Sequence, residues 1–239
     1  MKKNIALFVL SSFTLLSCSE HNSKKGNVII EGEIAGLKQG TLYLQQLKDN
    51  ELHTLDSIVI KGESKFNTAF DLPESEMIYL TLNRGTTQSL DNSITFFAEP
   101  GTIKITSSLD KFYSDAKVEG SQTQTIYNKY LSSKKRITDR KVELIKDQLL
   151  AAKNNQNVKA DSLQKQLYSI EKHLYLNAAN FSLKNNNSVA SAYITLTDVL
   201  PVSDRYVDSL YNNFTPEVKS NKYGQYIHEY LESVKNTSK

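Results

Sequence analysis

A change in hydrophobic periodicity near Gly120 divides this chain of 239 residues into two parts. From Asn27 to Gly120, apolar and polar residues alternate in short runs that turn-forming residues separate. A period of two predicts strands with one buried face, and about eight such runs at this spacing favour an antiparallel sandwich or barrel. No long helical pattern intervenes, which argues against a parallel sheet built from strand–helix–strand units. Residues 27–120 are therefore predicted to form an antiparallel β-domain, with turns at residues 36–40, 48–50, 61–63, 83–85 and 99–101.

After Gly120 the apolar residues recur at helical spacing, which predicts a helical domain over residues 121–239. Ser121 is the expected N-cap of the first helix, and a second helix is expected to start near Asp161 or Ser162. The two would form an αα-hairpin across a polar loop at residues 154–157. Shorter helices are expected over residues 189–199, 203–213 and 216–234. The chain as a whole is predicted to be α+β.

The N-terminal residues indicate export. Lys2 and Lys3 precede an apolar stretch that is too short for a bilayer-spanning helix, which needs about 20 residues, and that fits a secretory signal. Its end, Leu15-Leu16-Ser17-Cys18, resembles the lipobox of bacterial lipoproteins. This resemblance implies removal of residues 1–17 and acylation of Cys18, with residues 18–26 as lipidated cysteine and flexible tether. An uncleaved anchor, or a secretory signal followed by a chance cysteine, is the alternative interpretation.

The location within the envelope follows from the tether. Some Gram-negative lipoproteins carry an acidic cluster after the cysteine that directs them to the cell surface, and here only Glu20 is acidic. We therefore expect the protein on the outer membrane, anchored by its lipid and facing the periplasm.

Charge and cysteine content exclude several classes of function. The formal net charge is +3, and without Lys2 and Lys3 it is +1, so a nearly neutral body has no electrostatic basis for binding nucleic acid. Cys18 is the one cysteine of the chain, so the mature body has neither an internal disulfide nor a CxxC pair nor a thiolate metal site.

Several short motifs, taken in order, resemble one known domain. They are Ile29-Ile-Glu-Gly-Glu-Ile-Ala-Gly-Leu37, Gly40-Thr-Leu-Tyr-Leu44, Leu55-Asp-Ser-Ile-Val-Ile60, Phe96-Phe-Ala-Glu-Pro-Gly101 and Val118-Glu-Gly-Ser121. They resemble the N-terminal domain of unknown function, with its helical extension, of bacterial lipoprotein thiol:disulfide interchange proteins. In that family a thioredoxin-like domain with a CxxC site follows. This chain has no such motif, so the resemblance does not extend to oxidoreductase activity.

The search for chemistry yields few candidates. The four histidines are far apart in sequence and HExxH is absent, so no metal or cofactor is expected. His228 and Glu232 share a helix face and are more simply a solvated pair. Glu99, in the sequence Glu99-Pro100-Gly101, is a candidate ligand or partner contact, although Pro and Gly here are also good tight-turn chemistry.

Three short matches resemble an O-glycosylation pattern that exported proteins of one bacterial group carry. Each has Asp-Ser followed by Ile or Leu, which places the modified hydroxyl at Ser57, Ser162 or Ser209. Three-residue motifs have little specificity.

Three functions are consistent with these features. The first is a non-catalytic binding or scaffolding lipoprotein, whose helices or sandwich edge meet an envelope protein or a small ligand. The second is an accessory to a separate thioredoxin-like thiol–disulfide exchange protein. The third is an enzyme whose carboxylates meet only through the fold. We rank them in this order because the chain carries no catalytic motif.

Overall fold

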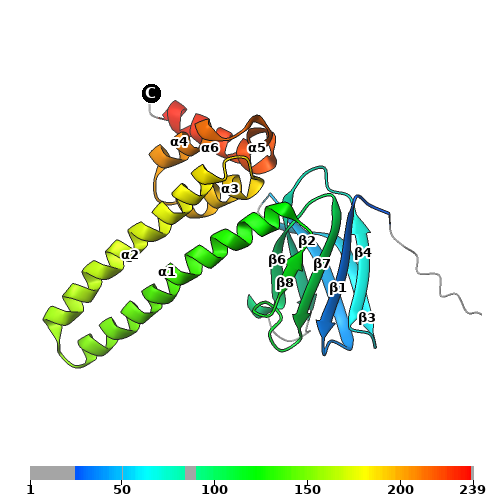
Figure 1. Cartoon of the computed structure of the whole chain (residues 1–239), viewed down its shortest axis with the longest axis horizontal. Helices are drawn as coiled ribbons and strands as arrows, with labels where there is room; N and C mark the ends of the chain where they lie inside the picture. The colour runs from blue at the N-terminus through cyan, green and yellow to red at the C-terminus, as the bar shows by residue number, and fades with distance from the viewer. Residues whose placement is uncertain (1–24, 50, 84–89, 238–239) are drawn as a thin grey trace, which may run out of the picture.

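The computed structural model describes residues 25–49, 51–83 and 90–237. The predicted signal segment and Cys18 lie outside these residues, as does most of the predicted turn at 83–85. The described chain contains a two-sheet β-sandwich followed by helices, so the α+β prediction is confirmed (Figure 1). Within the described residues, no helix combines the length and the apolar character that crossing a bilayer requires.

Eight described strands form the sandwich, close to the number that the alternation predicts. They are β1 (Val28–Ala35), β2 (Gln39–Lys48), β3 (Glu51–Lys61), β4 (Lys65–Phe70), β5 (Glu76–Asn83), β6 (Ser93–Ala98), β7 (Gly101–Ser108) and β8 (Lys117–Glu119). One sheet has the order β4-β1-β7-β8 and the other β3-β2-β5-β6. A 3-10 turn, η1 (Leu90–Asn92), precedes β6.

Strand alternation produces the core between the sheets. In β1, Val28, Ile30 and Ile34 are fully buried, while the residues between them face outward. Gly32 shares their face, and a Cβ there would lie 2.0 Å from the ring of Phe66. The glycine therefore makes room for an aromatic ring from the neighbouring strand β4.

One strand pair departs from the antiparallel prediction. β1 and β7 are parallel, with Val28 opposite Gly101 and Ala35 opposite Ser108. The reason lies in the turn before β7. This turn carries the chain from β6 in one sheet to β7 in the other, so β7 runs beside β1 in the same direction.

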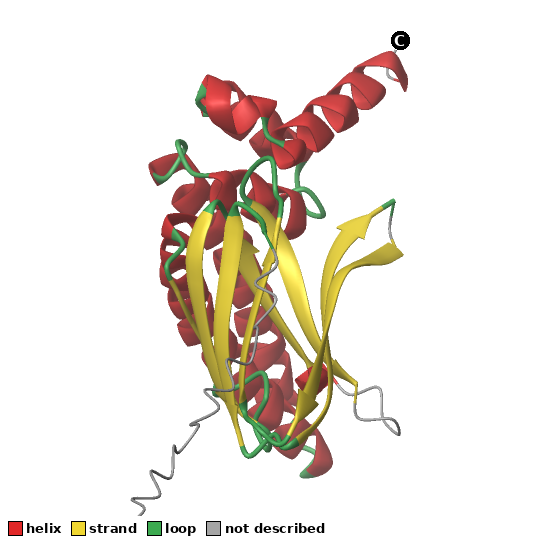
Figure 2. Ribbon diagram, turned by 90° about the vertical axis from the view of Figure 1, so that its right-hand side faces the viewer, coloured by secondary structure: helices red, strands yellow, loops and turns green. Residues whose placement is uncertain are grey.

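The helical part contains the expected hairpin. Its elements are α1 (Gln122–Lys153), α2 (Asn157–Lys184), α3 (Val189–Ile194), a π-helical turn η2 (Thr195–Val199), α4 (Asp204–Asn213), α5 (Pro216–Ser220) and α6 (Lys222–Thr237). In Figure 1, α1 and α2 project away from the sandwich, and α3 to α6 gather at the end of the hairpin that is nearer the strands. Figure 2, turned by 90°, shows these short helices above one end of the strands.

Two helix boundaries differ from the prediction. α2 begins at Asn157, about one turn before Asp161. The added turn, Asn-Val-Lys-Ala, contains no helix-breaking residue, and the Ala160 N–H donates to the backbone oxygen of Gln156 at 3.0 Å. The helix expected over 216–234 is two helices that meet at Asn221. The Asn221 side chain is buried and donates to the backbone oxygen of Ser75 at 3.2 Å, which ties this junction to the start of β5.

A second core joins the helices to the outer face of β5 and β6. Phe97 on β6 contacts the rings of Tyr127, Tyr193 and Tyr223 edge-on, with centroids 5.3, 5.5 and 6.3 Å away. Edge-to-face aromatic pairs at these distances are attractive. The sandwich and the base of the helical hairpin are thus packed through one aromatic cluster, which fixes α1 beside β6.

Candidate functional site: a groove between helix α1 and the sandwich edge

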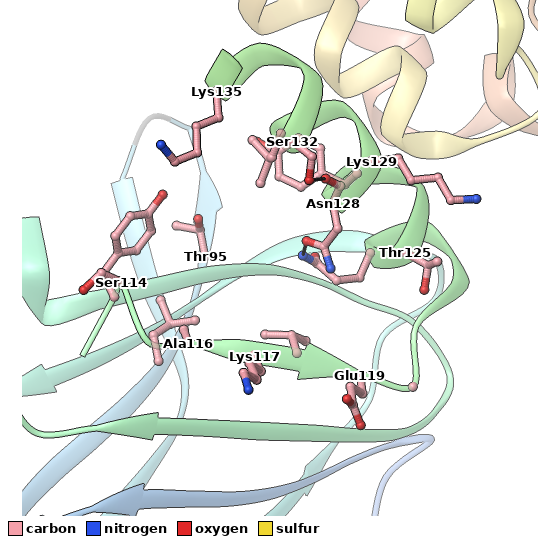
Figure 3. Close-up of a pocket in the computed structure, with 17 residues that line it drawn as sticks. Thr95, Ser114, Ala116, Lys117, Glu119, Thr125, Asn128, Lys129, Ser132 and Lys135 are labelled. Atoms are coloured by element: carbon pink, nitrogen blue, oxygen red, sulfur yellow. Dashed lines mark hydrogen bonds between the residues drawn. The ribbon is translucent and has the colours of Figure 1, made fainter. Parts of the chain in front are cut away.

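A groove of about 910 Å³ lies between the first turns of α1 and the side of the sandwich where β6 and β8 are the outermost strands (Figure 3). Thr95 of β6, the residues of β8 and the loop before it form one wall. The α1 residues from Gln124 to Lys135 that face them form the other. Concave sites occur preferentially between separately packed units, which is where this groove lies.

The groove lining is basic. It contains Lys117, Lys129 and Lys135 against a single carboxylate, Glu119, which gives a formal charge of +2. Lys135 pairs with Asp139 one turn along α1, at 2.6 Å between Nζ and Oδ2. No described residue forms an ion pair with Lys117 or Lys129, and the Lys129 side chain extends away from the groove centre in Figure 3.

The turn before α1 sets the position of the helix wall. Gly120 has φ of +101°, and a Cβ there would lie 2.1 Å from the backbone oxygen of Thr102. Only glycine combines this conformation with so close an approach. Ser121 then caps α1 by accepting from the N–H of Gln124 at 2.9 Å, so the predicted N-cap is confirmed.

Glu99 supports the same helix end. One carboxylate oxygen accepts from the N–H groups of Gln122 and Thr123, and the other from the Thr123 hydroxyl at 2.7 Å. A negative charge here also complements the positive end of the helix dipole. The structure thus gives Glu99 a capping role, and Gly101 has φ of +133°, as expected in a tight turn. Direct contact between Glu99 and a ligand stays a prediction.

Gln124 joins α1 to the outermost strand of the sheet. Its side-chain oxygen accepts from the backbone N–H of Phe97 at 2.7 Å, and its amide nitrogen donates to Asn128 at 2.7 Å. Gln124 and the Phe97 N–H are both buried. Their bond therefore replaces the hydrogen bonds to water that both groups lose on folding. The sequence gives no signal for this role of Gln124.

The junction of α5 and α6 makes further contacts between the helices and the sheet that contains β5. The Tyr223 hydroxyl accepts from the N–H of Met77 at 2.8 Å, and burial raises the pKa of Tyr223. Lys222 forms an ion pair with the buried carboxylate of Glu76 and donates to the backbone oxygen of Leu47 at 3.0 Å. These contacts hold the start of α6 against β2 and β5.

A second cavity, of about 740 Å³, lies between α1, α2 and the turn after η2. Asp198 of η2 accepts from Lys134 at 2.8 Å and from the hydroxyl of Tyr130. Burial, and then the hydrogen bond to Asp198, raise the pKa of Tyr130. Asp198 is a lone carboxylate in an otherwise apolar and hydroxyl-rich run, which is a signal that sequence reasoning had passed over.

The other predicted site residues do not gather. Ser57, Ser162 and Ser209 are exposed on β3, α2 and α4 respectively. His228 stacks on Tyr211 with ring centroids 5.8 Å apart, and Glu232 pairs with Lys235 at 3.0 Å. Among the described residues, no group of three or more His, Cys, Asp and Glu side chains is placed to hold a metal ion.

Comparison with known proteins identifies part of the chain as a domain without an assigned function. Residues 28–127 match the family model described as Domain of unknown function (DUF4369). The match spans all eight strands and the first turns of α1, so it includes the strand wall of the groove and the start of the helix wall. No curated protein and no solved structure matches the chain.

Proposed function

We propose that this chain is a non-catalytic binding or scaffolding module of the bacterial cell envelope, whose binding surface is the groove between α1 and the sandwich edge. The observation that carries the proposal is the construction of the groove. Its walls come from two packed units joined by buried contacts, Phe97 with Gln124 and Met77 with Tyr223, so its shape is fixed before any partner arrives. Its polar and basic lining, with Lys117 without an ion-pair partner among the described residues, suits recognition more than internal packing.

The N-terminal residues support the envelope location. The lipobox-like sequence ending at Cys18 implies an acylated cysteine, and residues 19–26 supply a polar tether. In this proposal the lipid holds the protein on the outer membrane, while the groove faces the periplasm and meets another envelope protein. A tethered module needs less affinity, because the anchor raises the local concentration of its partner.

Site-specific photo-crosslinking in cells tests the proposal. A crosslinking amino acid replaces Ser132, an exposed residue of the groove, and the matched control carries it at Lys165, exposed on the outer part of α2. A protein captured from the membrane fraction through position 132 and not through 165 supports the groove as the binding surface. Equal capture at both positions, or none at 132, refutes it.

The identity of a captured protein decides between binding roles. The resemblance to the front domain of lipoprotein thiol:disulfide interchange proteins favours a thioredoxin-like partner with its own CxxC site. Capture of such a protein through position 132 would make the chain a redox accessory. Capture of a transporter or assembly factor would make it a scaffold.

The carboxylate-enzyme hypothesis finds its best support in the second cavity, where both Glu171 and Asp198 lie in the lining. Two carboxylates in one cavity are the minimum for glycosidase-type chemistry. The Asp198 carboxylate is already engaged by Lys134 and Tyr130, so it serves more simply to hold η2 against α1. We therefore rank this function below binding through the groove.

A further inference from the structure

Two backbone N–H groups that donate to side chains, one on β5 and one on β6, show which groups of β6 point away from the ladder. Met77 of β5 lies opposite Phe97 of β6 in an antiparallel pair. The N–H of Met77 donates to Tyr223 at 2.8 Å, and the N–H of Phe97 donates to Gln124 at 2.7 Å. Both N–H groups therefore point away from the partner strand, which makes Met77 and Phe97 a non-hydrogen-bonded pair.

The same geometry recurs two residues along the strand. In an antiparallel ladder, hydrogen-bonded and non-hydrogen-bonded pairs alternate, so Thr95, opposite Tyr79, presents its N–H and C=O away from β5 in the same direction as Phe97. Thr95 lines the groove (Figure 3), and no described group accepts a hydrogen bond from its N–H. Gln124 thus occupies one outward position of the strand edge, and the next outward position opens into the groove.

We propose that the groove binds an extended acidic segment of a partner polypeptide, which adds as a strand to the β6 edge at Thr95. An exposed edge is a template for strand addition, in which main-chain hydrogen bonds provide the affinity. Gln124 sets the end of the added strand, because its side chain fills the edge position at Phe97. This inference rests on the proposed function and names the chemical class of the partner.

Charge selects the kind of segment. The groove lining has a formal charge of +2, and Lys117 on β8 stands without an ion-pair partner among the described residues. Every second side chain of an added strand shares a face with Thr95, the face that Tyr79 and Phe97 turn toward α1. Side chains on that face meet Lys135 of α1, whose exposed pair with Asp139 contributes little and can be exchanged for a carboxylate of the segment. Side chains on the opposite face meet the β8 wall with Lys117. An acidic residue on either face therefore meets a lysine, whereas a basic segment meets the same lysines with repulsion.

A backbone substitution tests strand addition directly. Thr95→Pro removes the outward N–H and leaves the ladder to β5 intact, since proline is tolerated at an edge position whose N–H faces outward. Thr95→Val is the matched control, because it keeps the N–H and the β-branched shape. The probe is a synthetic peptide in which Val and Glu alternate over about ten residues, and its charge-reversed counterpart alternates Val and Lys.

Fluorescence polarisation of the labelled peptides at low salt gives the result. We expect the acidic peptide to bind Thr95→Val within about twofold of the unsubstituted protein, and Thr95→Pro about tenfold more weakly or worse. The basic peptide is expected to bind at least about tenfold more weakly than the acidic one. Equal binding to the Pro and Val variants overturns strand addition, and absence of binding by the acidic peptide, or tighter binding of the basic one, overturns the acidic segment.

Circular dichroism would reveal a misfolded Thr95→Pro variant. In that case, hydrogen exchange in the unsubstituted protein provides a second test. In the unsubstituted protein, saturating acidic peptide is expected to slow hydrogen exchange of the Thr95 amide about tenfold, and an unchanged rate contradicts the proposal. If this inference fails while crosslinking through Ser132 still captures a partner, the groove remains the binding surface and only the strand mode is lost.

Discussion

The side-chain oxygen of Gln124 accepts a hydrogen bond from the backbone N–H of Phe97 at 2.7 Å, across the seam between helix and sheet. Without this bond, the last outward N–H of β6 would be buried beneath α1 with no partner. The bond also occupies the outward edge of β6 at Phe97. Gln124 therefore both positions α1 and marks the end of the groove along this strand.

Replacing Gln124 with Ala is expected to destabilise the protein by about 1 to 3 kcal/mol, because a buried N–H loses its acceptor. Chemical denaturation measures the free energy of unfolding. Asn128→Ala is the control, since the Asn128 side chain is exposed and accepts from the amide nitrogen of Gln124, at the end of that side chain that does not reach Phe97. If both variants lower the free energy of unfolding by the same amount, the bond between Gln124 and Phe97 is not what stabilises the protein.

Glu99 offers a test that separates a cap from a ligand contact. Glu99→Ala is expected to lower the free energy of unfolding by about 1 kcal/mol, because the first N–H groups of α1 lose a charged acceptor. The comparison variant, Glu119→Ala, removes an exposed carboxylate of the groove. Unchanged stability in Glu99→Ala together with lost partner capture would show instead that Glu99 acts on a ligand.

The buried tyrosines at the seam predict an alkaline limit to stability. Burial raises the pKa of Tyr193 to about 12, and burial also raises the pKa values of Tyr127 and Tyr223. Above about pH 10 the unfolded chain loses tyrosine protons that the folded protein retains, so the free energy of unfolding falls as pH rises from about 10 toward 12. Below pH 10 this contribution is fully present.

Denaturation curves between pH 9 and 12 check this slope. The Tyr193→Phe variant cannot ionise at that position, so its stability is expected to fall less steeply, and the exposed Tyr168→Phe controls for loss of one hydroxyl. A slope in Tyr193→Phe equal to that of the unsubstituted protein would contradict the assignment.

The proposed lipid anchor predicts that Cys18→Ser releases the protein from the membrane, because a serine hydroxyl does not form the thioether through which we propose the lipid is attached. Fractionation of cells followed by immunodetection measures the distribution, and Ser19→Ala is the neighbouring control. Membrane attachment that survives Cys18→Ser would mean that the protein is held in another way.

The sequence contained most of the fold because strand and helix periodicities are local properties. The alternation of Val28, Ile30 and Ile34 is enough to define β1, and Ser121 is enough to mark the start of α1. The parallel pairing of β1 with β7 could not be predicted, because it depends on which sheet the chain enters after Pro100. Packing between the sheets determines this, and it involves residues that are far from the turn in the sequence.

The site was less predictable than the fold. The groove depends on Thr95 and Lys117, which come from opposite sheets, and on an N–H direction that only the ladder register reveals. Glu99 stood out because of its turn, yet its capping partners are more than twenty residues away. Asp198 could have been noticed as a charge in an apolar run, whereas Gln124 resembles any polar helix residue.

The most direct test of the account is charge reversal of the groove. Lys117→Glu with Lys135→Glu changes one lysine on each wall, and Lys153→Glu with Lys165→Glu makes the same change on the outer part of the hairpin. Partner capture by crosslinking at Ser132 is measured in both backgrounds, after folding has been checked by circular dichroism. The account predicts that capture is lost in the groove variant and kept in the hairpin variant. Capture that persists in the groove variant, or is lost equally in both, would contradict the groove as the binding surface.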